Sequence, residues 1–375
     1  MSPPAALDVR EAASIAARHA EEADTGRLLH PDVAEALVGA GFARHFVPAT
    51  RGGHDGGAVE LLEAVAEVGQ ECASAAWCAS LAAGAARMGV FLPEEGQAEL
   101  WADGPDVFMA GALIPGGRAE RVAGGWRLTG GWDFTSGVDH SDWAMAAGVV
   151  HDGDRDRARF FAIPRKDYLV KDTWFNTGMR GTGSNTLLVD DVFVPASRSF
   201  DREDMLRGHA VGSTSPCHTA PLRAISGTLF AAPALGAARG ALQAWSRTAA
   251  VRVARTGLDA AENRAILTAA AHASVEVDVA EVLLCRAART CDRGEFGKAT
   301  EVRSPYDCAA AVDRLVDAVE RLFRTAGSRG QLATEPLQRF WRDLHSMASH
   351  VALQLDPPAA AYGRHLLEPL VPDQP

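Results

Sequence analysis

The chain has 375 residues, of which 47% are hydrophobic and 23% charged, a composition typical of a globular protein with two or three packed units. Its formal net charge of −11, with no long basic block, argues against a nucleic-acid-binding protein. No run approaches the length of a membrane-spanning helix, and the N-terminus "MSPPAALDVREAA" lacks the basic-then-apolar layout of a signal peptide. We therefore expect a cytoplasmic protein that binds neither nucleic acid nor membranes.

The cysteines show no metal-binding or disulfide pattern. The six residues, at positions 72, 78, 217, 285, 291 and 308, form no CxxC or CxxH spacing. In a reducing compartment we expect them to be small buried hydrophobic residues, and we expect no metal site.

The N-terminal part of the chain predicts helices. Apolar residues recur at three- and four-residue spacing through residues 7–104. The more apolar segment 59–91 predicts a pair of buried helices. We expect residues 1–104 to form an N-terminal α-helical domain.

Near Pro105 the pattern changes to short β-rich runs separated by glycine-rich turns. The predicted strands lie in "ERVAGGWRLTGGWDF" (120–134), "WAMAAGVV" (143–150), "RFFAIPR" (159–165) and "TLLVDDVFVP" (186–195), and "HDGDRDR" (151–157) predicts the tip of a hairpin. We expect a middle β-domain over residues 105–205.

The remainder of the chain returns to helical periodicity. Residues 201–225 have no clear period and predict a long irregular loop that could act as a lid over a substrate. From about residue 226 to 370 the pattern is helical, so we expect a C-terminal helical bundle over residues 206–375. The order of helices, strands and helices predicts an α+β protein.

Four motifs carry a resemblance over nearly the whole chain. They are "FVPATRGGHDG" (46–56), "GGWDFTSGVDHSDWAM" (130–145), "WFNTGMRGTGSNTLLVDDVFVP" (174–195) and "AGSRGQLATEPLQRFWRDLHSMASHV" (326–351). With the order of elements, they resemble the acyl-CoA dehydrogenase superfamily, and most of all its two-component reduced-flavin-dependent monooxygenases. That branch includes the p-hydroxyphenylacetate hydroxylase oxygenase component, the dibenzothiophene monooxygenases and the amino-sugar N-oxygenases. The resemblance implies an acyl-CoA dehydrogenase-like fold, with a β-barrel-like middle domain and a C-terminal four-helix bundle.

The second motif resembles the strand that places an aromatic residue and a hydroxyl against the flavin. Phe134 matches the aromatic residue and Ser136 the hydroxyl near flavin N5. A hydroxyl suits this position because it can both donate and accept a hydrogen bond. The alternative is that Ser136 is an ordinary serine where a strand enters a turn.

The third and fourth motifs imply further flavin contacts. Trp174 and Arg180 match residues that approach the flavin ring, and the glycines of the third motif could let backbone N–H groups hold a phosphate. The alternative for Arg180 is an ion pair with Asp190 or Asp191. In the fourth motif, Arg329 and Gly330 are candidates for contact with the flavin tail of a neighbouring subunit.

Two histidines lie in the segment 340–356, which predicts one helix. When the chain is aligned with acyl-CoA dehydrogenases at Arg342 and Asp343, their Tyr-Glu pair falls on His350 and Val351. In those enzymes the glutamate removes the α-proton of a thioester, and valine cannot accept a proton. The related monooxygenases keep a histidine at the position of His350, where it acts on the substrate or on the oxygenated flavin. Imidazole, with an ordinary pKa of about 6.5, suits acid–base work there. We expect His345 to be a solvated helix residue.

The substrate site departs from the related monooxygenases. Several of them carry an active-site histidine after a segment like "SAAWCASL" (74–81), but residues 82–91 contain none. We expect Arg87, or the loop 201–225 with His209 and His218, to compensate. The predicted substrate contacts are Arg87, His218 and Leu222.

The resemblance implies the oxygenase component of a two-component flavin-dependent monooxygenase. It would take reduced FMN or FAD, with FMN slightly favoured, from a separate reductase. It would use O2 through a C4a-hydroperoxyflavin to hydroxylate an aromatic, phenolic or nitrogen-containing small molecule, with natural-product biosynthesis as one setting. Ser136 and His350 would be the catalytic residues, in a homotetramer built as a dimer of dimers. Two alternatives stay open: an acyl-CoA dehydrogenase with a displaced base, and a catalytically silent flavin-fold binding protein.

Overall fold

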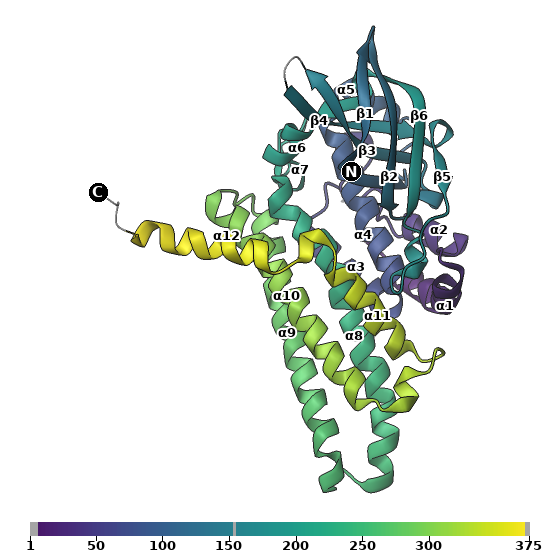
Figure 1. The fold of residues 1–375 in the computed structure, drawn as a ribbon, viewed down its shortest axis with the longest axis vertical. Coiled ribbons are helices and arrows are strands. Elements are labelled where there is room, and N and C mark those ends of the chain that lie inside the picture. Colours follow the sequence, from purple (N-terminus) through teal and green to yellow (C-terminus); the bar gives the residue numbers. More distant parts are fainter. Residues whose placement is uncertain (1–6, 153–154, 372–375) are drawn as a thin grey trace.

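The computed structural model describes residues 7–152 and 155–371, and helices flank a curved sheet at one end of an elongated bundle (Figure 1). Before the sheet, the described chain forms α1 (Arg10–Gly26), α2 (Pro31–Gly39), α3 (Ala58–Glu71), α4 (Ala73–Met88) and α5 (Glu94–Leu100). The predicted buried helix pair is confirmed: α3 and α4 are separated only by Cys72, whose backbone is extended. Nearly every residue of α4 is buried, because its small side chains let neighbouring elements approach from all sides.

Seven strands of the described chain form one sheet. They are β1 (Met109–Val122), β2 (Gly125–Thr135), β3 (Trp143–Asp152), β4 (Arg155–Pro164), β5 (Leu169–Lys171), β6 (Asn185–Pro195) and β7 (Ser199–Asp201), in the order β5-β6-β2-β1-β3-β4-β7. All neighbours are antiparallel except β1 and β3. The sheet curls around its own apolar core but keeps β5 and β7 as edges, so it is barrel-like without closing. The four predicted strand regions are confirmed.

The predicted hairpin tip falls between β3 and β4. His151 pairs with Asp156 and Asp152 with Arg155, which brings the two strands together as the sequence indicated. Residues 153 and 154, at the centre of the predicted turn, lie outside the described residues.

The chain after the sheet is helical. It forms α6 (Arg202–Arg207), α7 (Pro216–Thr219), α8 (Leu222–Thr256), α9 (Arg264–Asp292), α10 (Lys298–Thr325), α11 (Pro336–Ala348) and α12 (Asp356–Leu367). Helices α8 to α11 pack together as the predicted bundle, while α12 projects from its side (Figure 1). The prediction of an irregular loop over 201–225 is wrong in part, because two short helices lie within it. The Asp201 side chain caps α6, and Pro216 occupies the first turn of α7.

The prediction of one helix over 340–356 is also wrong. Helix α11 ends at Ala348, and His350 is extended, with φ −65° and ψ 137°. Its imidazole Nδ1 accepts the backbone N–H of Ala352 at 3.2 Å and so caps a short 3-10 turn, η9 (Val351–Leu353). His345 and His350 therefore lie on different elements, and an angle around a shared helix does not describe them.

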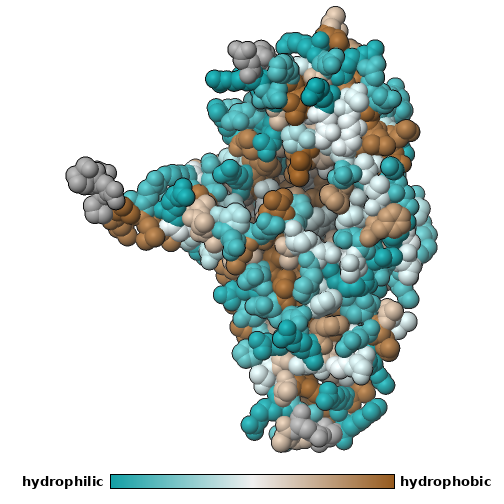
Figure 2. Space-filling model, viewed as in Figure 1, coloured by the Kyte–Doolittle hydropathy of each residue, from teal (hydrophilic) through white to brown (hydrophobic). Residues whose placement is uncertain are grey.

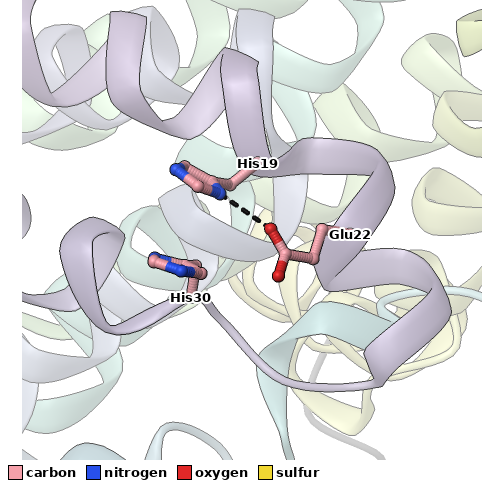
Figure 3. Close-up of side chains that lie close together, drawn as sticks. All are labelled: His19, Glu22 and His30. Atoms are coloured by element: carbon pink, nitrogen blue, oxygen red, sulfur yellow. Dashed lines mark hydrogen bonds and ion pairs between the residues drawn. The ribbon is translucent and has the colours of Figure 1, made fainter.

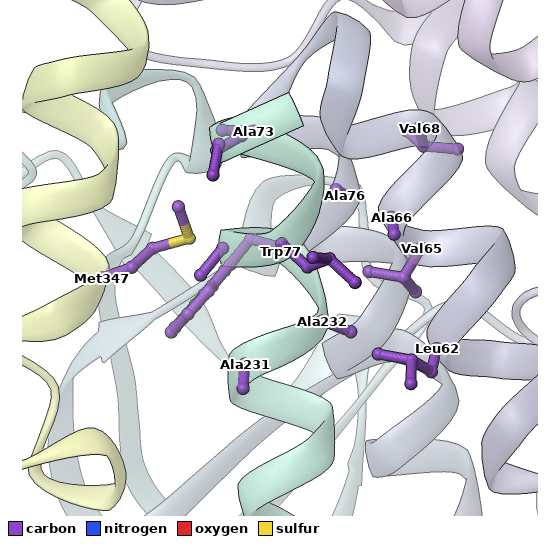
Figure 4. Close-up of a cluster of buried hydrophobic side chains, with 14 of the residues drawn as sticks. Leu62, Val65, Ala66, Val68, Ala73, Ala76, Trp77, Ala231, Ala232 and Met347 are labelled. Atoms are coloured by element: carbon purple, nitrogen blue, oxygen red, sulfur yellow. The ribbon is translucent and has the colours of Figure 1, made fainter. Parts of the chain in front are cut away.

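Close packing joins the N-terminal helices to the bundle. Helix α3 crosses α8 at Gly69 and Gly236, where a Cβ on Gly236 would lie 2.7 Å from the Gly69 Cα. The two glycines let the helix backbones meet, and this contact seats α4 against α8 and α11. Figure 4 shows Trp77 of α4 in the resulting apolar layer, with Ala231 of α8 and Met347 of α11 nearby.

The cysteines agree with the expectation from the sequence. All six cysteines lie in the described chain as buried free thiols, as predicted. Within the described residues, no helix combines the length and the apolar character needed to cross a membrane.

Candidate active site

A buried chain of hydroxyl groups starts at Ser136, just after β2. Ser136 is 9% exposed, and its Oγ accepts the indole N–H of Trp77 at 3.0 Å. The same oxygen lies 2.7 Å from Ser184 Oγ, and Ser184 Oγ lies 2.6 Å from Thr182 Oγ1. Thr182 in turn donates to the carbonyl of Met179 at 2.8 Å. Ser136 is therefore fixed between helix α4 and the segment that leads into β6.

His350 lies in an aromatic pocket formed by α4 and α8. Its ring stacks on Phe230 with 4.1 Å between centroids and meets the edge of Trp77 at 5.6 Å. Burial lowers the pKa of His350 to about 4, so the imidazole is neutral at neutral pH. Because Nδ1 accepts a backbone N–H, the proton of the neutral ring resides on Nε2, which is a hydrogen-bond donor.

Trp77 brings the two predicted catalytic residues together. Its indole N–H donates a hydrogen bond to Ser136, and the edge of its ring contacts His350. The sequence analysis assigned no role to Trp77 or to Phe230. The available signal was a lone tryptophan inside the alanine-rich helix α4, where a large polar-tipped ring needs a hydrogen-bond partner.

The predicted flavin aromatics form an exposed apolar face beside this site. Phe134 is 75% exposed and adopts a left-handed backbone with φ 60°, and its ring meets the edge of Trp174 at 6.1 Å. Trp174 is held by its backbone N–H on Asn185 Oδ1 and by its indole N–H on the Met179 carbonyl. A bulky residue rarely adopts positive φ, and a large exposed aromatic ring is typical of a surface that a ligand covers. An exposed aromatic face next to a buried hydroxyl fits a planar ring with polar edges such as a flavin.

Arg180 does not pair with Asp190 or Asp191, so that alternative is wrong. Its Nε donates to the Asp24 carbonyl at 2.7 Å and lies 3.7 Å from the Asp24 carboxylate, whereas Asp191 pairs with Arg127. Arg180 therefore ties the segment after Trp174 to α1. Its contact with a flavin stays a prediction.

The glycines of the third motif serve protein packing in this structure. A Cβ on Gly178 would lie 2.2 Å from the Arg342 carbonyl oxygen, and one on Gly181 would lie 2.9 Å from Ala23 Cβ. These positions need glycine because the loop presses against α11 and α1. The geometry does not support the expectation that they open the backbone to a phosphate.

The Arg342–Asp343 pair, which set the alignment of His350, clamps the same loop onto α11. Asp343 accepts the backbone N–H of Met179 at 2.5 Å, and Arg342 donates to the Thr177 carbonyl and pairs with Asp24. Burial raises the pKa of Asp343 to about 6. The pair thus supports the loop that positions Trp174 and the hydroxyl chain.

Arg87 and His218 hold the chain rather than line an open site. Arg87 is 2% exposed and donates to the carbonyls of Cys217, His218 and Ala220. The His218 ring is fully buried between Ser213 Oγ and the Phe46 carbonyl. The geometry supports neither residue as a substrate contact. The hydrogen bonds of Arg87 also fix the second half of the predicted lid in place.

The other predicted contacts lie at the ends of bundle helices. Leu222 is half-buried at the start of α8. Arg329 and buried Gly330 belong to the 3-10 turn η8 (Ser328–Gln331) between α10 and α11. Arg329 is exposed, and no other described residue pairs with its guanidinium. Their roles toward substrate and flavin stay predictions.

A surface cluster on α1 and α2 brings together His19, Glu22 and His30 (Figure 3). The two imidazoles stack with 4.0 Å between centroids and 15° between planes. His19 Nδ1 is bonded to Glu22, and His30 Nδ1 accepts the Asp32 N–H as the cap of α2. The lone pairs of the two rings lie in nearly parallel planes, a geometry that does not suit two imidazole ligands of one tetrahedral ion. The cluster serves the junction of two helices.

Comparisons with known proteins agree with this architecture. Residues 228–355 match the family described as "Acyl-CoA dehydrogenase, C-terminal domain". The chain is 32% identical over 371 residues to the oxygenase component of FADH(2)-dependent resorcinol hydroxylase from Rhizobium sp. (strain MTP-10005), covering 94% of this chain and 90% of the relative.

Two solved structures share the whole fold. The crystal structure of 3-HSA hydroxylase from Rhodococcus sp. RHA1 matches with a TM-score of 0.90 and 29% identity, over 98% of each chain. XiaF from Streptomyces sp., in complex with FADH2 and glycerol, matches with a TM-score of 0.88 and 25% identity, over 98% of this chain and 96% of its own. The acyl-CoA dehydrogenase-like fold predicted from the motifs is confirmed. The chain belongs to the family of oxygenase components of two-component flavin-dependent monooxygenases.

Proposed function

We propose that this enzyme hydroxylates a phenolic small molecule, with His350 donating a hydrogen bond to the phenolic oxygen. The observation that carries the proposal is the junction at Trp77, which sets the Ser136 hydroxyl and a neutral imidazole around one indole. The relative named resorcinol hydroxylase supports a phenol as the substrate class.

The proposal changes the role that the sequence suggested for His350. An imidazole with a pKa of about 4 is a weak base, and its free nitrogen, Nε2, already carries the proton. His350 therefore orients a phenol and stabilises negative charge as it develops on the oxygen, rather than removing the proton itself.

The surroundings of His350 count against a displaced-base acyl-CoA dehydrogenase. Burial lowers the pKa of His350 to about 4, so the ring is a weak proton acceptor. Val351, at the position of the dehydrogenase glutamate, is an exposed aliphatic side chain. Neither His350 nor Val351 is therefore a suitable acceptor for the α-proton of a thioester.

The proposed cofactor is a reduced flavin delivered by a separate reductase. When bound, it supplies the activation of O2. Phe134 and Trp174 would cover its ring, and Ser136 would hold a polar edge. The relatives named for FADH(2) support FAD over the FMN that the sequence slightly favoured.

We further propose that the enzyme is a tetramer held partly by helix α12 and its end. The arm leaves the body with no buried residue in α12, and hydrophobic side chains gather near its end (Figure 2). Leu366, Leu367, Leu370 and Val371 are exposed there. Helix α9 exposes a second apolar stripe at helical spacing, formed by Leu267, Val275, Val279 and Val282. Exposed apolar surfaces of this kind are typical of subunit contacts.

A variant truncated after Gln354 should form an assembly with fewer subunits, measured as its molar mass by light scattering. If the truncated variant is still a tetramer, the arm is not part of the interface.

The central experiment mixes anaerobic protein and reduced FAD, then reduced FMN, with oxygenated buffer containing resorcinol as the probe phenol. We expect a transient near-ultraviolet flavin absorbance that outlives free reduced flavin, and conversion of resorcinol to a benzenetriol. The flavin with the longer-lived transient is the preferred one. Oxidation indistinguishable from free flavin, together with reduction of bound FAD by an acyl-CoA, would instead establish the dehydrogenase alternative.

A further inference from the structure

The hydroxyl chain at Ser136 permits only one arrangement of protons. Three oxygen–oxygen contacts join Ser136 to Ser184, Ser184 to Thr182, and Thr182 to the Met179 carbonyl, at 2.7, 2.6 and 2.8 Å. Oxygens at such distances need one proton in each contact, and the three hydroxyls supply three protons.

The direction follows from the last member of the chain. A carbonyl has no proton, so Thr182 must donate to Met179. Thr182 then accepts from Ser184, and Ser184 accepts from Ser136. Every proton points from Ser136 toward the Met179 carbonyl.

Ser136 is left as an acceptor alone. Its proton is used on Ser184, and one lone pair accepts the Trp77 indole N–H at 3.0 Å. One lone pair remains, on a residue that is 9% exposed and follows the 75% exposed Phe134 by two positions. A ligand that reaches the Ser136 hydroxyl therefore meets an acceptor there, because its proton is already donated to Ser184.

We propose that Ser184 and Thr182 are positioning residues that make Ser136 select reduced over oxidised flavin. This inference rests on the proposed function. The reduced ring carries an N–H donor at N5, whereas the oxidised ring presents a lone pair at the same atom. A fixed acceptor is matched to the first and opposed to the second, because a buried lone pair facing another lone pair leaves both unsatisfied.

The test measures dissociation constants for oxidised and anaerobically reduced FAD, and the midpoint potential of the bound flavin. Thr182→Val removes the end of the chain, so Ser184 can donate to Ser136 and free the Ser136 proton for an outside acceptor. Met179 keeps two other donors, the Trp174 indole and the Thr182 backbone N–H. We expect the ratio of the oxidised to the reduced dissociation constant to fall about tenfold, which lowers the midpoint potential by about 30 mV for a two-electron couple.

Ser184→Ala is the second variant and should move the ratio in the same direction, because it removes the acceptor of the Ser136 proton. Thr228→Val is the matched control: Thr228 is also buried, but its hydroxyl contacts Cys308 Sγ at 3.9 Å, away from the chain. The control should keep the wild-type ratio and potential. Thermal unfolding of all three variants checks that they fold.

The outcomes separate this inference from the proposed function. If wild-type protein binds reduced FAD and hydroxylates a phenol, but folded Thr182→Val and Ser184→Ala keep its affinity ratio and potential, the inference is wrong and the function stands. If wild-type protein binds no reduced flavin, the proposed function fails, and this inference fails with it.

Discussion

The indole of Trp77 donates its N–H to Ser136 Oγ at 3.0 Å while its ring edge lies 5.6 Å from the centre of His350. One side chain from the N-terminal helices thereby connects the end of β2 with the turn after α11. The proposed flavin-facing hydroxyl and the proposed substrate-facing imidazole are held in a fixed relation by a residue that need not react.

Trp77→Phe should weaken this connection while leaving the packing of the ring largely intact. The change removes the N–H donor to Ser136, and we expect a loss of about 1 kcal/mol in the free energy of unfolding. The transient flavin absorbance should also decay faster, because Ser136 loses one of the two contacts that fix its hydroxyl. Trp245→Phe is the control, since it removes a similar indole bond, to Thr325 Oγ1 at 3.1 Å, within the bundle. Equal decay rates in the two variants would deny Trp77 any special role.

Substitutions of His350 distinguish hydrogen-bond donation from proton removal. His350→Ala should lower product formation by about a hundredfold while flavin oxidation proceeds. His350→Gln keeps an N–H donor without a basic nitrogen, so we expect it to recover part of the activity. His345→Ala, outside the aromatic pocket, should behave as wild type. If the glutamine variant is as inactive as the alanine variant, His350 acts as a base.

Asp343→Asn should change how stability depends on pH. Because burial raises the pKa of Asp343 to about 6 from 3.8, the folded state binds this proton more tightly than the unfolded state does. That contribution is full below about pH 4 and is lost as the pH rises through 6. The amide can still accept the Met179 N–H but does not titrate, so the variant should gain on the order of 2–3 kcal/mol relative to wild type between pH 4 and 7.

Denaturant unfolding across that pH range measures the difference between the two proteins. His350 contributes in the opposite sense, since its lowered pKa makes stability fall as the pH drops from about 6.5 toward 4. Both proteins share that contribution, so it cancels in the comparison. If the free energy of unfolding of the variant falls relative to that of wild type as the pH rises, the charged carboxylate stabilises the fold.

Arg87→Met should test whether this buried arginine is structural. Its loss leaves the carbonyls of Cys217, His218 and Ala220 without their donor, and we expect a loss of about 3 kcal/mol in the free energy of unfolding. Arg207→Met, on an exposed side chain of α6, is the control and should change stability little. In folded Arg87→Met at saturating flavin, KM for the phenol should stay within about twofold of wild type. A large rise in KM without loss of stability would return Arg87 to the substrate site.

The sequence by itself determined the order of the elements and the alignment of the motifs. Periodicity separates helical from strand segments because burial of one face imposes a period of 3.6 or 2 residues. Alignment on the Arg342–Asp343 pair located His350, and in the structure that pair holds the loop backbone at Thr177 and Met179.

Only the tertiary structure decided what the candidate residues contact. From the sequence, Arg87 and His218 were polar side chains that could contact a substrate. In the structure, packing buries both against backbone carbonyls. Trp77 had no predicted role, yet it joins Ser136 to His350 because α4, α8 and the end of β2 meet there. The direction of the hydroxyl chain depends on distances among Ser136, Ser184 and Thr182, and spacing along a sequence does not contain such distances.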